Sequence, residues 1–246
     1  MTSISKIALA CAALVAASGA LAQKAGDNIV GLGLAYISPR ADLGKMTSSS
    51  PGDSNVTGTT FTGALNGASA NVGPQTTVSL GLLHMYTDNI GGEFTIGIPA
   101  QFTQDLSSGG VNHSGAATMK IWTPTAVAKY FFATPQDKWR PYVGFGVSRV
   151  SFHNVTTLND GVAGTLHMLA GTSADLSASW APVYNLGAIY NIDDKWSING
   201  SVSYIPAKTT ATFVGQGDPR AATTVTTTGD VKMNTTDFVV RVGYKF

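Results

Sequence analysis

The chain has 246 residues, of which 12% are charged and 43% are hydrophobic, and its formal net charge is +1. Soluble domains carry roughly 25% charged residues, so another kind of polar side chain must solvate this protein. The 15 Lys and Arg residues are scattered along the chain, which excludes the clustered basic face that phosphate binding needs. We therefore predict no nucleic-acid partner.

Residues 1–22 have the pattern of a secretory signal peptide. Lys6 supplies the positive start, residues 7–17 form the apolar core, and Ala20 and Ala22 complete an A-x-A cleavage site. The core is too short for a membrane-spanning helix, which needs about 20 apolar residues. Cys11 would be removed with this segment. We predict two parts, a signal peptide at residues 1–22 and a cysteine-free secreted barrel at 23–246.

The mature part shows period-two alternation rather than helical periodicity. No stretch after residue 22 has 18 uninterrupted apolar residues, which excludes helical membrane spans. Eight segments of about ten residues alternate between apolar and small or polar side chains, as tilted membrane strands do. They are residues 28–37, 76–86, 92–102, 121–132, 141–152, 179–192, 196–204 and 237–246.

The connections between these segments alternate between short and long, as in outer-membrane barrels with tight periplasmic turns and extended outer loops. The short ones are residues 87–91, 133–140 and 191–195, and the long ones are 38–75, 103–120, 153–178 and 207–236. All four Trp residues fall at predicted strand ends, which suits an interfacial aromatic belt. The fold class is therefore all-β, an eight-stranded antiparallel transmembrane barrel. The alternative is a soluble β-sandwich, which would need a polar solvent face.

Several short motifs resemble the OmpW/AlkL family of eight-stranded outer-membrane barrels. They are the run 87–91 followed by Glu93, the Pro-Thr pair at 124–125 before the aromatic run 130–132, the run 140–146, and the closing residues 243–246. The resemblance covers most of the mature chain. It implies a passive conduit for small hydrophobic molecules in the outer membrane of a Gram-negative bacterium.

An eight-stranded barrel is just wide enough to be filled by side chains or to hold one small ligand, so its inward residues decide between the two. Small and apolar inward side chains favour a channel for hydrophobic molecules over an ion pore. Inward glycines can also merely relieve steric crowding in a tightly curved sheet. The candidate lumen-lining residues are Gly81, Leu83, Met85, Thr95, Thr125, Val183 and Ser203. Glu93, Lys129 and Arg241 are predicted to form a charge cluster that narrows the periplasmic end, because unpaired charges in a confined lumen are costly.

Four prolines fall near the outer ends of predicted strands: Pro99, Pro124, Pro182 and Pro206. Each removes a backbone donor from the ladder, so weak pairing there could open the wall sideways and release a solute into the bilayer. The alternative is that these prolines only end strands as they enter loops.

Three function classes stay open. The first is the conduit, with outer-membrane lipid, lipopolysaccharide and small hydrophobic solutes as partners, and with the outer-membrane assembly machinery engaging the last strand through Phe246. The second is a structural barrel whose loops serve in adhesion or as a colicin or phage receptor. An enzyme is disfavoured because the hydrolase and metalloprotease motifs are absent, although Ser151, His153 and Asp175 could converge near the rim. We predict no cofactor and no metal.

Overall fold

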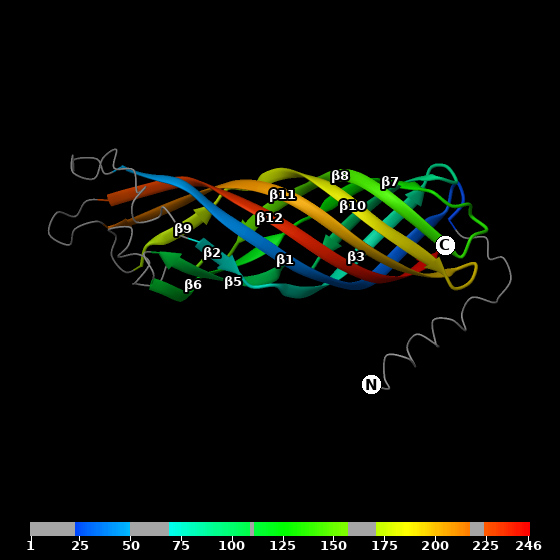
Figure 1. The fold of residues 1–246 in the computed structure, drawn as a ribbon, viewed down its shortest axis with the longest axis horizontal. Helices are drawn as coiled ribbons and strands as arrows, with labels where there is room; N and C mark the ends of the chain where they lie inside the picture. Colours follow the sequence, from blue (N-terminus) through cyan, green and yellow to red (C-terminus); the bar gives the residue numbers. More distant parts are fainter. Residues whose placement is uncertain (1–22, 50–68, 109–110, 157–170, 217–223) are drawn as a thin grey trace, which may run out of the picture.

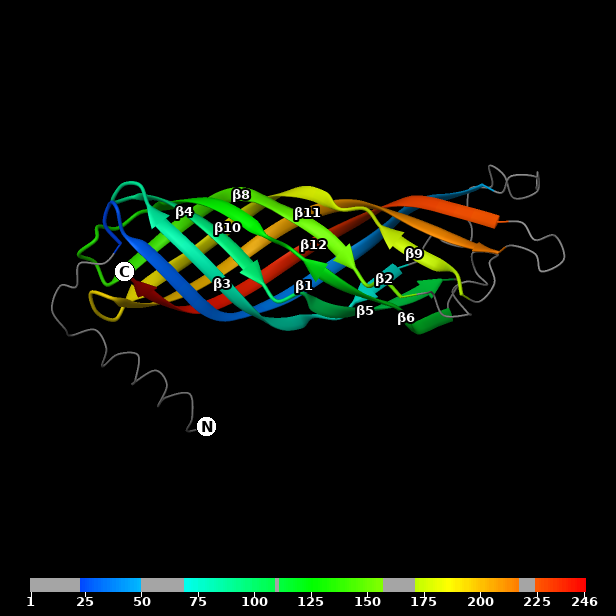
Figure 2. The ribbon, with the colours of Figure 1, turned by 180° about the vertical axis from the view of Figure 1, so that it is seen from behind.

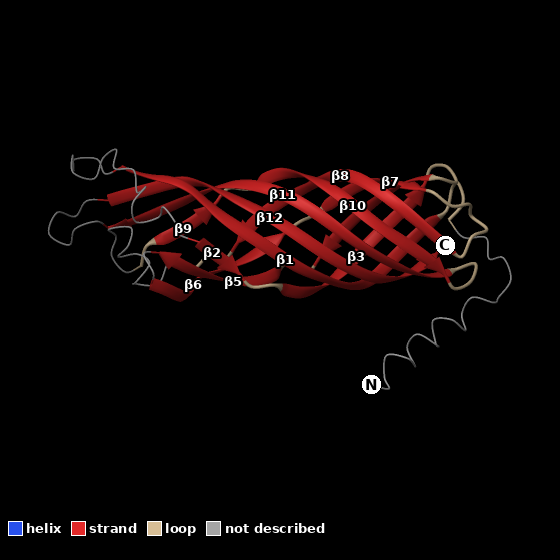
Figure 3. Cartoon of the chain, in the orientation of Figure 1, coloured by secondary structure: helices blue, strands red, loops and turns tan. Residues whose placement is uncertain are grey.

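The computed structural model describes residues 23–49, 69–108, 111–156, 171–216 and 224–246, which form β-strands joined by turns (Figures 1 and 3). The strands are β1 (Asn28–Ser49), β2 (Ser69–Val72), β3 (Gln75–Met85), β4 (Ile90–Gly97), β5 (Ala100–Ser108), β6 (Val111–Trp122), β7 (Thr125–Phe131), β8 (Trp139–His153), β9 (Ser173–Leu176), β10 (Ser179–Asn191), β11 (Trp196–Gln216) and β12 (Thr224–Lys245). Within these ranges there is no helix long and apolar enough to cross a membrane. The predicted signal peptide at residues 1–22 lies outside the described residues.

Eight of the described strands close into a ring in the order β1, β3, β4, β7, β8, β10, β11 and β12, and β12 pairs again with β1 (Figures 1 and 2). All neighbours in the ring are antiparallel. A closed ring leaves no strand edge, so its backbone groups can pair with each other where no water is available. The predicted eight-stranded antiparallel barrel is confirmed.

The outer face of the ring carries an apolar belt. Leu32 is 59% exposed and Leu34 is 57% exposed on β1, whereas the intervening inward positions are glycines. The same alternation on the neighbouring strands exposes Leu82, Phe94, Tyr130, Phe145, Tyr184, Leu186, Phe238 and Val240. So large an exposed apolar surface is stable only against lipid, which excludes the soluble sandwich.

Short turns join the strands at one end of the barrel, and the last residues of the chain lie at the same end (Figure 1). The turns occupy residues 86–89, 132–138 and 192–195. In the last of these turns, Asp193 Oδ1 accepts hydrogen bonds from the backbone N–H groups of Lys195 and Trp196, at 2.8 and 2.7 Å. These backbone bonds lower the pKa of Asp193. This is the predicted periplasmic end.

At the opposite end the wall continues well beyond the predicted strands. β1 and β12 stay paired from Leu43 outward through a bulge to Ser49, and β11 and β12 stay paired as far as Gln216. The predicted ends at residues 37 and 204 and the predicted start at 237 were therefore wrong. In the outer extension the alternation reverses, because the outward side chains become polar and the inward side chains become apolar. The buried inward residues here include Ala41, Met46, Phe102, Met119, Ala211, Val225 and Val231.

Two further segments predicted as single strands are each divided in two. The segment 92–102 is interrupted at Ile98 and Pro99 between β4 and β5, and the segment 121–132 at Thr123 and Pro124 between β6 and β7. The first break shifts the alternation by one residue, because Phe94 is 51% exposed whereas Phe102, at an even spacing from it, is buried. Both breaks lie at the same height of the barrel wall.

We expect the outward belt to set the stability of the barrel in lipid. Leu32→Arg places a charge against hydrocarbon and should lower the free energy of unfolding by about 2–4 kcal/mol. Thr228→Arg, at an exposed position of the outer extension, should change it by no more than about 0.5 kcal/mol. Urea unfolding in phospholipid vesicles, followed by tryptophan fluorescence, measures both. Equal costs would contradict the placement of the membrane.

Candidate functional site

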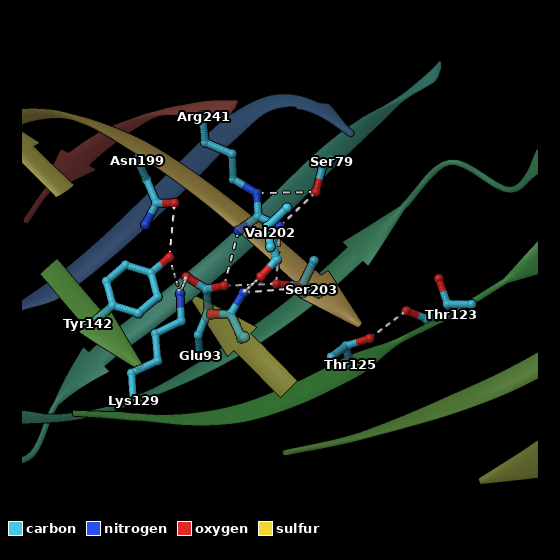
Figure 4. A network of polar contacts seen from close by, with 12 residues as sticks. Ser79, Glu93, Thr123, Thr125, Lys129, Tyr142, Asn199, Val202, Ser203 and Arg241 are labelled. Atoms are coloured by element: carbon cyan, nitrogen blue, oxygen red, sulfur yellow. Dashed lines mark hydrogen bonds and ion pairs between the residues drawn. The ribbon is translucent and has the colours of Figure 1, made fainter. Parts of the chain in front are cut away.

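A charged network crosses the lumen in the half of the barrel nearer the periplasmic turns, which we call the lower half. Glu93 on β4 lies between two cations, with its Oε2 2.8 Å from Lys129 Nζ on β7 and its Oε1 3.1 Å from Arg241 Nη1 on β12 (Figure 4). The side chains of Lys129 and Arg241 are 1% and 5% exposed. The structure thus brings together the three residues of the predicted charge cluster.

Neutral side chains complete the hydrogen bonding of this network. Lys129 Nζ also donates to Tyr142 Oη at 3.2 Å, and the Tyr142 hydroxyl donates to Asn199 Oδ1 at 3.2 Å. On the other side, Arg241 Nε and Nη2 donate to Ser79 Oγ at 3.1 and 2.8 Å. These residues come from six strands of the ring, so the network spans the barrel and forms a floor across the lumen.

Two of the inward glycines make room for this floor. A Cβ atom at Gly81 would lie 2.7 Å from Arg241 Nη1, and one at Gly187 would lie 2.5 Å from Tyr142 Oη. Real Cβ atoms do not approach other heavy atoms so closely. At these two positions the glycine therefore accommodates a large polar side chain from a nearby strand, Arg241 two strands away and Tyr142 on the adjacent strand.

Below the network, toward the periplasmic turns, apolar side chains and then a third buried cation occupy most of the lumen. Leu83 and Met85 pack there in a buried cluster with Ile29, Phe131, Tyr142 and Ile189. At the mouth, Arg140 is fully buried, and its guanidinium donates to the backbone carbonyls of Gln23, Asp88 and Ala133. The periplasmic end is thus closed in layers.

Above the network lies a cavity with an empty volume of about 690 Å³, which includes space open to solvent. Glu93 and Arg241 form its lower boundary. Its wall combines polar residues with apolar ones, namely Thr77, Ser79, Thr95, Thr123, Thr125, Asn185, Ser201, Ser203 and Asp237, and Ala35, Ile37, Ile98, Ile121, Trp122, Val127, Ile205 and Val239.

The cavity reaches the barrel wall at an interruption of the sheet, which we call the seam and define as residues 96–99 facing 122–124. Pairing between β4 and β7 ends at Thr95 with Thr125, and pairing between β5 and β6 resumes at Ala100 with Ile121. Ile98, which lines the cavity, is 63% exposed at the surface.

Each side of the seam is hydrogen-bonded to the strand that lies away from the seam, which is β3 on one side and β8 on the other. Ile98 N donates to the Val78 carbonyl at 3.1 Å, and Arg149 N donates to the Pro124 carbonyl at 3.0 Å. Pro124 has no N–H to offer across the seam. Hydrogen bonds to β3 and β8 therefore stabilise the two sides of the seam, and no backbone ladder within the described residues joins the two sides directly.

The predicted site residues divide between these levels. Thr95, Thr125 and Ser203 line the cavity, Gly81 lies against the network, Leu83 and Met85 lie in the closed layer below it, and Val183 packs in a buried apolar cluster. Of the four prolines, Pro99 and Pro124 flank the seam. Pro182 and Pro206 are each paired on one side, with Val147 and Asn234, but pairing between β10 and β11 ends at Tyr184 with Tyr204, so these two prolines lie at a second interruption of the sheet.

Sequence reasoning missed Ser79, Tyr142, Arg140 and Asp237 as lumen residues. Inward parity was a usable signal for Tyr142, which precedes an outward Val143, and for Ser79, which precedes an outward Leu80. The same parity places Arg140 inward, two residues before Tyr142, but the backbone carbonyls that it bonds carry no sequence signal. The Ser151 hydroxyl, considered above for an enzyme, donates to the Trp122 carbonyl at 3.3 Å.

The ring, the apolar belt and the filled lower lumen define an eight-stranded barrel of the bacterial outer membrane. Residues 24–246 match the model of the OmpW family, and the chain belongs to that family. It is thus an outer-membrane protein of a Gram-negative bacterium.

Relatives and solved structures agree with this assignment. Outer membrane protein W of Vibrio cholerae is 28% identical over 244 residues, covering 97% of each chain, and outer membrane protein AlkL of Ectopseudomonas oleovorans is 31% identical over 163 residues, covering 65% of this chain and 63% of its own. The crystal structure of OprG from Pseudomonas aeruginosa shares the fold, with a TM-score of 0.73 at 23% identity over 92% of this chain and 99% of its own.

The network predicts that loss of its carboxylate destabilises the barrel more than loss of one of its cations. Glu93→Gln leaves two buried cations without their common carboxylate and should lower the free energy of unfolding by about 3–5 kcal/mol. Lys129→Met should cost clearly less, because Glu93 keeps Arg241. Urea unfolding of both variants in phospholipid vesicles measures the difference. A larger cost for Lys129→Met would show that Glu93 is not the centre of the network.

Proposed function

We propose that the protein is a passive conduit for small hydrophobic molecules, which enter the cavity from the outer end and leave sideways through the seam into the bilayer. The observation that carries this proposal is the cavity above the charged floor, which reaches the barrel wall where the ladder is interrupted. A solute on this route passes from the cavity between the apolar side chains of Ile98 and Trp122 into lipid.

The closed lower lumen supports release to the side over release into the periplasm. An apolar solute moving downward would have to displace the Glu93 bonds to Lys129 and Arg241, and breaking a buried ion pair is costly. It would then meet the buried cluster around Met85 and the Arg140 contacts at the mouth. The side exit requires no such step.

The composition of the seam supports its use by apolar solutes. Ile98 and Trp122 lie on opposite sides of it, both line the cavity, and both are exposed at the surface, at 63% and 40%. Apolar side chains on a path between cavity and lipid keep a hydrophobic molecule away from water, which otherwise costs roughly 25 cal/mol per Å² of exposed apolar surface.

The prolines provide a matched test of the exit. The double variant Pro99→Ala and Pro124→Ala restores two backbone donors at the seam and should slow passage about threefold to tenfold, since one backbone hydrogen bond contributes about 0.5–1.5 kcal/mol. The control is Pro141→Ala near the periplasmic turns, where β8 and β10 stay in register on both sides of the proline, and it should leave the rate unchanged.

The measurement is the entry of N-phenylnaphthylamine, a hydrophobic dye whose fluorescence rises in lipid, into cells that carry each variant in the outer membrane. Cells without the protein give the background rate. Equal rates for the seam variant and the control would reject the side exit, and a rate at background for the unaltered protein would reject the conduit.

A further inference from the structure

Two buried acceptor atoms of the cavity wall lack a hydrogen-bond partner among the described residues. They are Asp237 Oδ1 on β12 and Asn185 Oδ1 on β10. Buried polar atoms in folded proteins are almost always bonded, so an orphaned pair in one cavity calls for an explanation. Both atoms are acceptors, so both require a donor.

The orientation of Asn185 is fixed by its own amide group. Its Nδ2 donates to the Val202 carbonyl at 3.2 Å and to Ser203 Oγ at 2.9 Å. A carbonyl oxygen can only accept, so the nitrogen must face Val202 and the amide oxygen is the end left over. This oxygen cannot be satisfied by exchanging the two ends of the amide.

Among the described residues, no cation pairs with Asp237. Arg241, on the same face of β12 but about 13 Å farther along the strand, gives its guanidinium to Glu93, Ser79 and Thr95. The register pairs Asn185 with Ser203 and Ser203 with Asp237, so the two acceptors flank one hydroxyl in a row across three strands. We call Asn185, Ser203 and Asp237 the acceptor row.

The acceptor row lies across the barrel from the seam. Going round the ring from the seam, β11 is reached after β7, β8 and β10, and β12 is reached after β4, β3 and β1. These two strands are therefore the farthest from the seam in either direction. The cavity thus has a polar wall with two unpaired acceptor atoms on one side and the apolar residues Ile98, Ile121 and Trp122 on the other.

We propose that this cavity binds small amphiphiles, primary amines and alcohols with an apolar tail, through a hydrogen-bond-donating head on the acceptor row and with the tail directed at the seam. The proposal rests on the proposed function for the entry of apolar solutes and names the class that the cavity selects. An ammonium head binds more tightly than a hydroxyl because it carries more donors and stabilises the ionised form of Asp237. A carboxylate head is rejected, since it offers no donor and is repelled by Asp237.

Binding is tested by nuclear magnetic resonance on the protein in phosphatidylcholine nanodiscs, with empty nanodiscs to correct for partitioning into lipid. The probes are n-hexylammonium, n-hexanol and n-hexanoate. We expect saturable shifts of the backbone amide signals of Asn185, Ser203 and Asp237 with hexylammonium, weaker ones with hexanol and none with hexanoate. Asp237→Leu should weaken hexylammonium binding by about tenfold or more.

The control is Asp175→Leu, which removes an exposed carboxylate outside the cavity and should leave the affinity unchanged. If Asp237→Leu does not fold, Asp237→Asn serves, because it removes the charge alone and should abolish the preference for hexylammonium over hexanol. Equal shifts with hexanoate, no saturable shifts with any probe, or an unchanged affinity in the Asp237 variant would overturn the proposal.

Dye entry separates this proposal from the conduit itself. An Asp237→Leu variant that still admits N-phenylnaphthylamine but has lost hexylammonium binding supports both the acceptor row and the conduit. A protein that binds hexylammonium but admits no dye retains the acceptor row and loses the conduit. Dye entry without hexylammonium binding overturns the acceptor row alone.

Discussion

The rest of this structure depends on the need to pair backbone N–H and C=O groups where no water can reach them. The ring of eight strands meets this need without any edge, and the belt of exposed leucines and aromatics then faces lipid. The same constraint makes an interruption of the ladder costly. An interruption that persists at residues 96–99 and 122–124 is therefore compensated from the flanking strands, as the bonds to Val78 and from Arg149 show.

The interior follows a second constraint, the cost of isolating charge from water. Glu93, Lys129 and Arg241 are inward on three strands that converge in the lower half of the barrel, and the carboxylate serves both cations. Tyr142 and Ser79 supply the remaining hydrogen bonds. The bonded network fills the section of the barrel, so the usable space lies above it.

Much of the fold follows from the sequence because lipid enforces a simple alternation. Phe238, Val240 and Val242 point outward for the same reason that Leu32 and Leu34 do, and this pattern predicts the barrel, its strand number and its periplasmic end. The outer extension was not predicted, because above the membrane the outward residues become Ser and Thr, which are equally typical of loops. The divided strands escaped notice because Pro99 and Pro124 interrupt pairing without interrupting the apolar pattern.

The site was predictable to the extent that it depends on local parity. Glu93, Lys129 and Arg241 could be placed inward from their own strands, and their contact followed from the shared periplasmic end. Which prolines meet depends instead on how strands far apart in the chain are registered. Pro99 and Pro124 share a seam because β4 and β7 are neighbours, and Pro182 and Pro206 share a second gap because β10 and β11 are neighbours whose pairing ends at Tyr184 with Tyr204.

The acceptor row was out of reach for the same reason. Asn185, Ser203 and Asp237 are unremarkable polar residues in sequence, and what distinguishes them is the absence of a described donor beside Asp237 and Asn185. Shape and polarity then reinforce each other, because the polar wall faces the seam across the full width of the ring. In a lumen too narrow for a solute to turn freely, this opposition determines which end of an amphiphile reaches the lipid first.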